Sequence, residues 1–252
     1  AMFGIRGSFA GLLKGQIELA GKLRRFADVT PPFLPVVDGT HLPGDIMAGL
    51  KAGAAKDIDV VIGKTREEMT AFYAIDKAVQ EADDAAIDRV FAATFGADGP
   101  AHRSAYARMR ASRKPMAILG DMMTDRRFRA HSLRFAEQQA ALGRPAYVYQ
   151  FDWQSPQFQA CHCLEIPFMF DNLADWPDSP MLAGGDAEEM AALARAMNQA
   201  WIAFARTGNP SHDGIPPWRA YGPERRTTMR FDSIVDPIDD LAGLNWRPAW
   251  PA

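Results

Sequence analysis

The stretch Leu142-Gly143-Arg144-Pro145-Ala146-Tyr147-Val148-Tyr149-Gln150-Phe151 decides the fold class of this 252-residue chain. Its glycine and its proline end a helix that the spacing of apolar residues predicts over 124–142. The run 146–151 that follows is rich in the aromatic and β-branched residues of a buried strand. A helix, a short turn and a strand in this order form one αβ unit, so we predict an α/β protein built in layers.

A second strand is predicted earlier in the chain, at Ile58-Asp59-Val60-Val61-Ile62-Gly63. The residues directly after it, Lys64-Thr65-Arg66-Glu67-Glu68, are expected to form an exposed polar turn. If this strand and the strand over 146–151 are parallel neighbours, the residues that follow each of them emerge at one edge of the sheet. In open α/β sheets that edge is where binding and catalytic sites form.

The remaining elements are read from periodicity, caps and breakers. Asp186 and Glu189 have the spacing of a capping box at the start of the clearest helix, and Gly208 follows its end. Prolines are expected to keep 152–185 irregular. The predicted helices are 46–52, 84–95, 103–113 and 187–207, and the further strands are 36–37, before a turn at Asp38-Gly39, and 227–231.

The two ends of the chain are expected to differ from its middle. Residues 1–30 are predicted to contain a leading amphipathic helix over 9–26, which either packs on the main body or lies on a membrane surface. Residues 233–252 are predicted to form an irregular, proline-rich tail. The first residues do not have the pattern of a secretory signal, and the compartment, cytoplasmic or secreted, stays open.

Composition excludes several classes of protein. Hydrophobic residues make up 48% and charged residues 23% of the chain, which argues against intrinsic disorder. The formal net charge of −3 argues against a nucleic-acid partner, since such proteins carry a basic surface. No apolar run approaches the roughly 20 residues of a membrane span. The two cysteines, Cys161 and Cys163, are one residue apart and are expected to be reduced.

His162 is the residue best suited to chemistry, because an imidazole gains and loses a proton near neutral pH. A histidine that acts as a base needs an acid on its other ring nitrogen, and Glu68 or Glu67 would supply one from the neighbouring strand. The alternative is a packed, hydrogen-bonded histidine with no catalytic role. A metal site at His162 and its flanking cysteines is not favoured, since the sequence offers no second pair of cysteine ligands.

Six motifs together resemble the type-B carboxylesterases, the family of para-nitrobenzyl esterase and cholinesterase. The residues 161–170, Cys-His-Cys-Leu-Glu-Ile-Pro-Phe-Met-Phe, are similar to the histidine motif of that family, and 62–68, Ile-Gly-Lys-Thr-Arg-Glu-Glu, to its acid motif. The other matches are 37–43, Thr124-Asp125-Arg126 opening a helix, 147–152 and 201–210. The likeness covers about residues 31–232.

The resemblance implies an α/β-hydrolase fold and hydrolysis of carboxylic esters by a Ser-Glu-His triad. It implies that Glu68 is the triad acid, with Glu67 as the fallback, and that His162 is the general base. Glu165 would be a buried structural partner of the histidine. Met69 replaces the glycine that usually follows the acid, which puts the shape of that turn in question. The family needs no metal or organic cofactor.

The nucleophile of the family has no counterpart in this sequence. None of the eight serines lies in Gly-x-Ser-x-Gly; Gly7-Ser8-Phe9-Ala10-Gly11 comes nearest but in the wrong register. The resemblance therefore implies that residues 1–252 are the C-terminal portion of one esterase domain, with an incomplete sheet flanked by helices. Its expected partners are a small-molecule ester and the missing N-terminal half. The alternative is a catalytically inactive fragment or family member that acts as a binding or interaction module.

Overall fold

The computed structural model describes residues 26–28, 35–109 and 114–241 of the chain. It divides into two compact units, Ala1–Ile46 and Met47–Ala252. The predicted leading helix lies outside the described residues, as do the end of the predicted helix 103–113 and the last residues of the tail. Within the described residues, no helix is long and apolar enough to cross a bilayer.

In the first unit, the expected turn at Asp38-Gly39 is present. The Asp38 carboxylate accepts hydrogen bonds from the backbone N–H groups of Thr40, His41 and Leu42 at 2.8–3.0 Å, which holds the pKa of Asp38 far below its usual value. The predicted strand at Val36–Val37 is wrong. These two side chains are 75% and 57% exposed, and no strand is assigned there.

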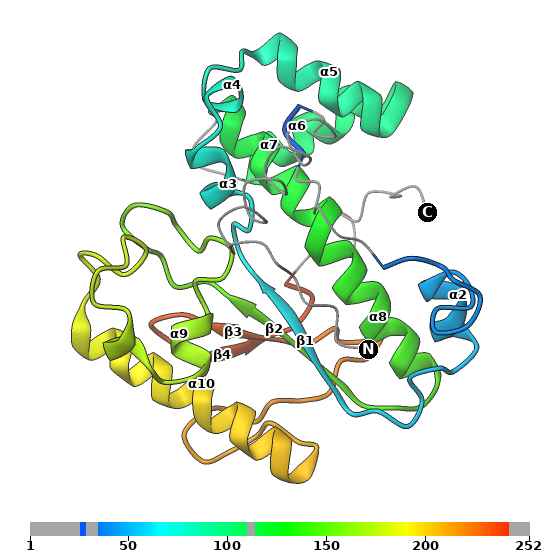
Figure 1. The fold of residues 1–252 in the computed structure, drawn as a ribbon, viewed down its shortest axis with the longest axis vertical. Helices are drawn as coiled ribbons and strands as arrows, with labels where there is room; N and C mark the ends of the chain where they lie inside the picture. The colour runs from blue at the N-terminus through cyan, green and yellow to red at the C-terminus, as the bar shows by residue number, and fades with distance from the viewer. Residues whose placement is uncertain (1–25, 29–34, 110–113, 242–252) are drawn as a thin grey trace, which may run out of the picture. The chain divides into compact units, whose positions relative to one another are not determined.

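The second unit contains a four-stranded sheet in the order β1-β2-β3-β4 (Figure 1). Strands β1 (Val60–Thr65), β2 (Ala146–Phe151) and β3 (Thr228–Phe231) are parallel neighbours, and β4 (Asp236–Ile238) pairs antiparallel with β3. The predicted α/β class and the predicted adjacency of the first two strands are confirmed. β4 corrects the expectation of a wholly irregular tail; its Pro237 is tolerated because β4 is an edge strand.

Helices cover both faces of the sheet (Figure 1). Alternate residues of β1 and β2, among them Ile62 and Val148, pack on one face against Ala136 of helix α8 (Ala130–Ala141). The residues between them face helix α10 (Ala187–Thr207) and the short helix α9 (Ile166–Met169). Gly63 is essential to this packing, since a Cβ there would lie 2.3 Å from the ring of Tyr149 on β2.

Two helices have the bounds that their caps predict. Asp186 begins α10 by accepting from the N–H of Glu189, and Gly208, with φ of 74°, ends it. The Glu189 carboxylate does not close the capping box; it accepts instead from Trp153 Nε1 at 2.7 Å. Helix α5 (Asp84–Phe95) begins in the same way at Asp83. The further helical segments are α2 (Ile46–Lys51), α3 (Thr70–Ala74), α4 (Lys77–Gln80), η1 (Gly96–Asp98), α6 (Gly99–Met109) and η3 (Leu173–Asp175).

The predicted helix over 124–142 is wrong at its start. A helix begins nine residues earlier, as α7 (Pro115–Thr124), and runs through a π-helical turn, η2 (Asp125–Arg129), directly into α8. Thr124-Asp125-Arg126 therefore does not open a helix, because Pro115 at the first helical position does so instead. Helix α6 likewise begins before the predicted residue 103.

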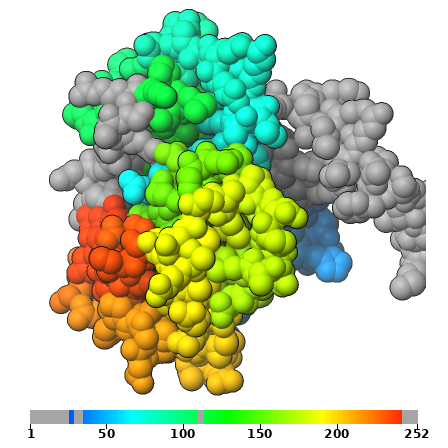
Figure 2. Space-filling view, turned by 90° about the vertical axis from the view of Figure 1, so that its left-hand side faces the viewer, coloured from blue at the N-terminus to red at the C-terminus, as the bar shows by residue number. Residues whose placement is uncertain are grey.

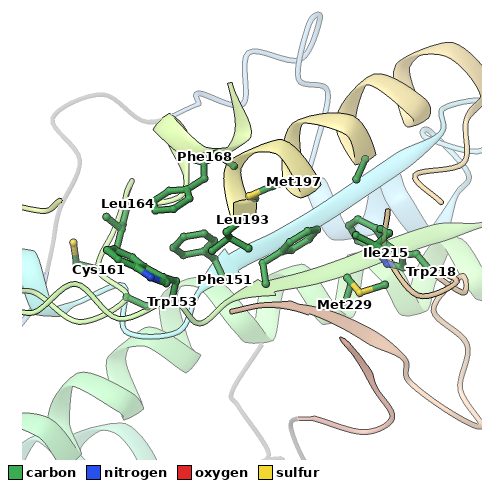
Figure 3. Close-up of a cluster of buried hydrophobic side chains, with 14 of the residues drawn as sticks. Phe151, Trp153, Cys161, Leu164, Phe168, Leu193, Met197, Ile215, Trp218 and Met229 are labelled. Atoms are coloured by element: carbon green, nitrogen blue, oxygen red, sulfur yellow. The ribbon is translucent and has the colours of Figure 1, made fainter. Parts of the chain in front are cut away.

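The main apolar core lies between the sheet and helices α9 and α10 (Figure 3). Phe168 of α9 and Leu193 and Met197 of α10 surround Phe151 of β2. In the space-filling view, the yellow segment that contains α10 lies directly against the orange and red segments that lead into β3 and β4 (Figure 2). This continuous packing gives the carboxyl ends of β1 and β2 a rigid base.

Candidate active site

The segment after β1, residues 66–69, is tied to the end of β2 and to the chain beyond it. The N–H of Arg66 donates to the carbonyl of Phe151, and that of Glu67 to the carbonyl of Ala160, both at 2.8 Å. We call residues 66–69 the acid loop. These two bonds bring the acid loop to residues 160–162, although the two segments are more than 90 residues apart in sequence.

The acid loop is not the exposed turn that the sequence predicts. Glu67 and Glu68 are 4% and 3% exposed, and Lys64 before them is 4% exposed. Strand β1 continues past Gly63 to Thr65 because the register with β2 extends to Phe151. Lys64, Glu67 and Glu68 are therefore buried at the end of the strand, where each of them needs a partner, whereas Arg66 is exposed.

Glu68 and His162 meet at this edge of the sheet. Glu68 Oε2 lies 2.6 Å from Nδ1 of His162, and its other oxygen, Oε1, accepts from the N–H of Thr65 at 2.8 Å. Both oxygens of the carboxylate are thereby fixed. The distance is that of a strong, charge-assisted hydrogen bond.

The His162 ring lies between Phe72 of α3 and Phe128 of η2, with centroid distances of 5.2 and 5.4 Å. Its side chain is 39% exposed, whereas that of Glu68 is 4% exposed. Within the described residues Nε2 of His162 has no hydrogen-bond partner. The imidazole is thus held on one nitrogen and open on the other.

The hydrogen bond to Glu68 raises the pKa of His162, against the opposing effect of burial. The charged imidazolium is favoured in the folded protein, so this contact stabilises the fold fully below the ordinary histidine pKa. Its contribution is lost as the pH rises through the raised value. A base with a raised pKa also needs a higher pH to become neutral. Any activity that depends on neutral His162 should therefore begin to rise at a higher pH.

Glu67, the fallback acid, is engaged elsewhere. Its Oε2 accepts from Gln154 Nε2 and from the N–H of Ala160, both at 3.1 Å. Arg66 Nε lies 3.2 Å from its other oxygen. The two adjacent glutamates therefore have different surroundings, and only Glu68 contacts the imidazole.

Met69 does not disturb the acid loop. Its φ and ψ are −79° and −12°, ordinary right-handed values at which glycine has no advantage. Its N–H donates to Thr124 Oγ1 at 3.3 Å, and its side chain is fully buried. The doubt raised by a methionine in the glycine position is removed by this backbone geometry.

Glu165 lies one helical turn beyond His162 and begins α9. Burial raises the pKa of its carboxyl to about 7, and the charge of Glu68 acts in the same direction. Its Oε2 is buried without a hydrogen-bond partner. Glu165 is therefore an acid whose charge is disfavoured beside the histidine, and it is not bonded to the ring.

The two cysteines that flank His162 are free thiols. Burial raises the pKa of Cys161 to about 12, and its Sγ lies 3.6 Å from Met181 Sδ. Cys163 has a φ of 67°, in the left-handed region that favours glycine. In the part of the chain that the structure describes, no three or more histidine, cysteine or acidic side chains gather as metal ligands.

Sequence reasoning missed a group of buried polar side chains next to the acid loop, on the α8 face of the sheet. Asp125 of η2 lies 2.9 Å from Arg129 Nη1 and accepts from the Tyr106 hydroxyl at 3.0 Å. Arg129 donates to Gln150 Oε1, and Gln150 donates to Asp152 Oδ1. We call Lys64, Asp125, Arg129, Gln150 and Asp152 the charge cluster. Its one signal in the sequence is a lysine that follows the β-branched run 60–62 after a single glycine.

The chain matches the model of the Carboxylesterase family over residues 14–240. It is 32% identical over 214 residues to phenmedipham hydrolase of Pseudarthrobacter oxydans, covering 83% of this chain and 42% of that protein. It is 33% identical over 227 residues to para-nitrobenzyl esterase of Bacillus subtilis, covering 87% of this chain and 43% of the relative. The chain therefore spans less than half the length of these relatives.

Solved structures agree with this assignment. A Geobacillus stearothermophilus carboxylesterase, EST55 at pH 6.2, matches 96% of this chain with a TM-score of 0.75 and 28% identity, over 55% of its own length. A structure of para-nitrobenzyl esterase matches 98% of this chain with a TM-score of 0.72 and 27% identity, over 49% of its own length. The protein belongs to the carboxylesterase family, and its fold is part of an α/β hydrolase.

Proposed function

We propose that this chain supplies the acid and the base of a serine carboxylic ester hydrolase, with Glu68 as the acid and His162 as the base. The observation that carries the proposal is the 2.6 Å contact between Glu68 Oε2 and His162 Nδ1, with Nε2 left open. The carboxylate holds the imidazole in one orientation and favours its charged form, which is what a general base needs when it accepts a proton.

In the proposed mechanism, a serine hydroxyl attacks the ester carbonyl while Nε2 of His162 takes its proton. Glu68 stabilises the resulting imidazolium through Nδ1–H. The imidazolium then gives the proton to the leaving alcohol, and an acyl-serine remains. In the second half, Nε2 takes a proton from water as the water attacks the acyl group, and returns it to the serine as the acid leaves.

The serine and the oxyanion-binding N–H groups would come from an N-terminal portion of the same domain, of which residues 1–252 would be the C-terminal portion. Strand β1 supports this arrangement. It forms the edge of the sheet and has no neighbour on its outer side among the described residues, yet Val60, Val61 and Ile62 carry apolar side chains that are only half-buried. An apolar edge of this kind is normally covered by another strand.

The proposed substrate is a small carboxylic ester. Two relatives are named as a phenmedipham hydrolase and a para-nitrobenzyl esterase. Phe72 and Phe128, which flank the imidazole, would give an aromatic group an apolar wall to pack against.

The test compares the 252-residue chain with the complete gene product, whose upstream coding sequence is expected to contain Gly-x-Ser-x-Gly in frame. The complete protein should hydrolyse a para-nitrophenyl ester and react with a fluorophosphonate probe, whereas the chain alone should do neither. His162→Gln should lower kcat/KM of the complete protein by about 10³-fold or more. Turnover that survives His162→Gln would refute the proposal.

The second candidate is a catalytically inactive protein that acts as a binding module. The absence of any serine in Gly-x-Ser-x-Gly favours it. If the gene encodes no such motif upstream and the natural product does not react with the fluorophosphonate, this second function replaces the first. The Glu68–His162 contact would then serve the stability of the fold.

A further inference from the structure

Lys64 is the buried cation closest in sequence to the acid loop. Its Nζ donates to the carbonyl of Thr65 at 2.9 Å and more weakly to that of Arg66 at 3.4 Å. These two carbonyls belong to the residues at which β1 ends and the chain turns toward Glu68. The lysine side chain thus bends forward over the end of its own strand and fixes the turn from inside the protein.

The same turn determines where the Glu68 carboxylate lies. The N–H of Thr65 donates to Glu68 Oε1, and Oε2 then faces His162. A rotation of the Thr65–Arg66 peptide, whose carbonyl Lys64 binds, would shift the backbone that leads to Glu68 and move its carboxylate away from the Thr65 N–H and from the ring. Lys64 contacts neither the imidazole nor the outer surface, so any effect on His162 must pass through this backbone.

Nζ of Lys64 does not form an ion pair among the described residues, so no carboxylate needs the lysine to be charged. Burial is the largest cause that lowers the pKa of Lys64, to about 7, and Arg129 acts in the same direction, whereas Asp125, Glu68 and Asp152 favour the positive charge. Asp125 is already bonded to Arg129 and Tyr106. The direct contacts of Nζ are the two carbonyls, for which a neutral amine is also a donor.

We propose that Lys64 is a positioning residue of the active site, which holds Glu68 beneath His162 by binding the carbonyls of Thr65 and Arg66. The inference rests on the proposed function only in taking Glu68 and His162 as acid and base. Its test measures the histidine itself and requires no ester hydrolysis, so that the two proposals fail independently.

The sign of the change in the His162 pKa separates positioning from simple electrostatics. Removing a cation from the site favours the imidazolium and raises the pKa of His162. Loss of the Glu68 contact lowers that pKa, because this hydrogen bond is the largest cause of its elevation. The charged groups that act on His162 are Glu68 and Glu165.

The test uses Lys64→Met, which keeps the length of the stem and removes the donors. Because Nζ bonds two carbonyls and no carboxylate among the described residues, Lys64→Met breaks no buried ion pair, and we expect the variant to fold. The rate of acylation of His162 by diethyl pyrocarbonate, followed on its peptide by mass spectrometry between pH 5.5 and 9, gives the pKa of His162 in the 252-residue chain. We expect a decrease of about 0.5 unit or more. An unchanged or increased value in a folded variant would overturn the proposal.

Three comparisons make the result specific. Lys56→Met removes an exposed lysine and should leave the His162 pKa unchanged, and exposed His41 serves as the reference in each digest. Lys64→Gln keeps a donor without the charge; it should give a smaller decrease, and it decides the question if Lys64→Met does not fold. In a Glu68→Gln background, Lys64→Met should have no further effect. A decrease of equal size there would show that Lys64 does not act through Glu68.

Discussion

The two faces of the sheet differ in chemistry at the level of the active site. On the α10 face, Phe151, Phe168 and Phe231 are fully buried in a core of aromatic and aliphatic side chains. On the α8 face, Ile62 and Val148 give way to the charge cluster as β1 and β2 approach their carboxyl ends. The apolar face provides stability, whereas the polar face determines where individual groups lie.

This difference follows from the directionality of the forces involved. Apolar burial is roughly proportional to area and tolerates small displacements. A buried charge must have its hydrogen bonds made, and each bond has a preferred length and angle. Lys64 belongs to the charge cluster on the polar face, and the acid loop begins two residues after it in the sequence. Substitutions on each face measure how far the two faces have separate roles.

The largest effect is expected on the apolar face. Phe231→Ala removes a fully buried ring that contacts Tyr149, Trp201 and Trp218, and it should lower the free energy of unfolding by about 3–5 kcal/mol. Denaturant titration measures this change. Phe170→Ala, at a position that is 63% exposed, is the matched control and should have little effect. Equal losses in both variants would remove the distinction between core and surface.

Breaking the charge cluster should have the next largest effect. Asp125→Asn leaves the partly buried Arg129 without its carboxylate partner, so the free energy of unfolding should fall by about 2–4 kcal/mol. The exposed pair of Lys77 and Glu81 provides the comparison, and Glu81→Gln should change little. Thermal unfolding of both variants at one pH measures the difference. If the charge cluster only fills space, Asp125→Asn should lower the unfolding temperature as little as Glu81→Gln does.

The raised pKa of Glu165 predicts that the stability of the fold depends on pH. Its folded pKa is raised to about 7, so the folded protein holds this proton more tightly than the unfolded chain, and stability falls as the pH rises from about 4.5 to 7. Glu165→Gln should therefore be more stable than the wild type at pH 8, by about 1 kcal/mol, and show no such gain near pH 4.5. Exposed Glu224→Gln should behave alike at both pH values. A gain for Glu165→Gln at low pH instead would reverse the sign of the argument.

The smallest effect concerns the backbone beside the histidine. Cys163 has a φ of 67°, at which a glycine is less strained than a residue with a Cβ. Glycine also makes the unfolded chain more flexible, which opposes this gain. Taken together, Cys163→Gly should stabilise the fold by about 0.5 kcal/mol. Cys163→Ala keeps the strained backbone and removes the thiol, which isolates the two contributions. A Gly variant that is no more stable than the Ala variant would show that the turn is relaxed as it stands.

Local signals account for what the sequence predicts well. Helices α5 and α10 begin and end at their capping residues, and β2 follows a helix stop at Gly143. The pairing of Glu68 with His162 follows from one topological assumption, that two parallel strands are neighbours, and β1 and β2 are. The catalytic role of the pair stays a prediction.

What the sequence does not reveal depends on the surroundings of a residue in space. Val36 and Val37 are β-branched, but no strand of the described residues pairs with them, and their side chains remain exposed. Lys64 looks like part of a solvated turn, yet it is buried, because its Nζ donates to the carbonyls of Thr65 and Arg66 and η2 packs against β1. As a π-helical turn, η2 leaves no local pattern in the sequence. The identity of a loop's neighbours decides its burial, and those neighbours are distant in sequence.

The adjacent glutamates of the acid loop allow the most direct test of the central claim. Glu67 and Glu68 are equally buried and differ in what they contact, since only Glu68 faces the imidazole. In the complete protein, Glu68→Gln should lower kcat/KM for a para-nitrophenyl ester by about 10³-fold or more, and Glu67→Gln by about tenfold or less. The opposite order, or full activity in Glu68→Gln, would contradict the account.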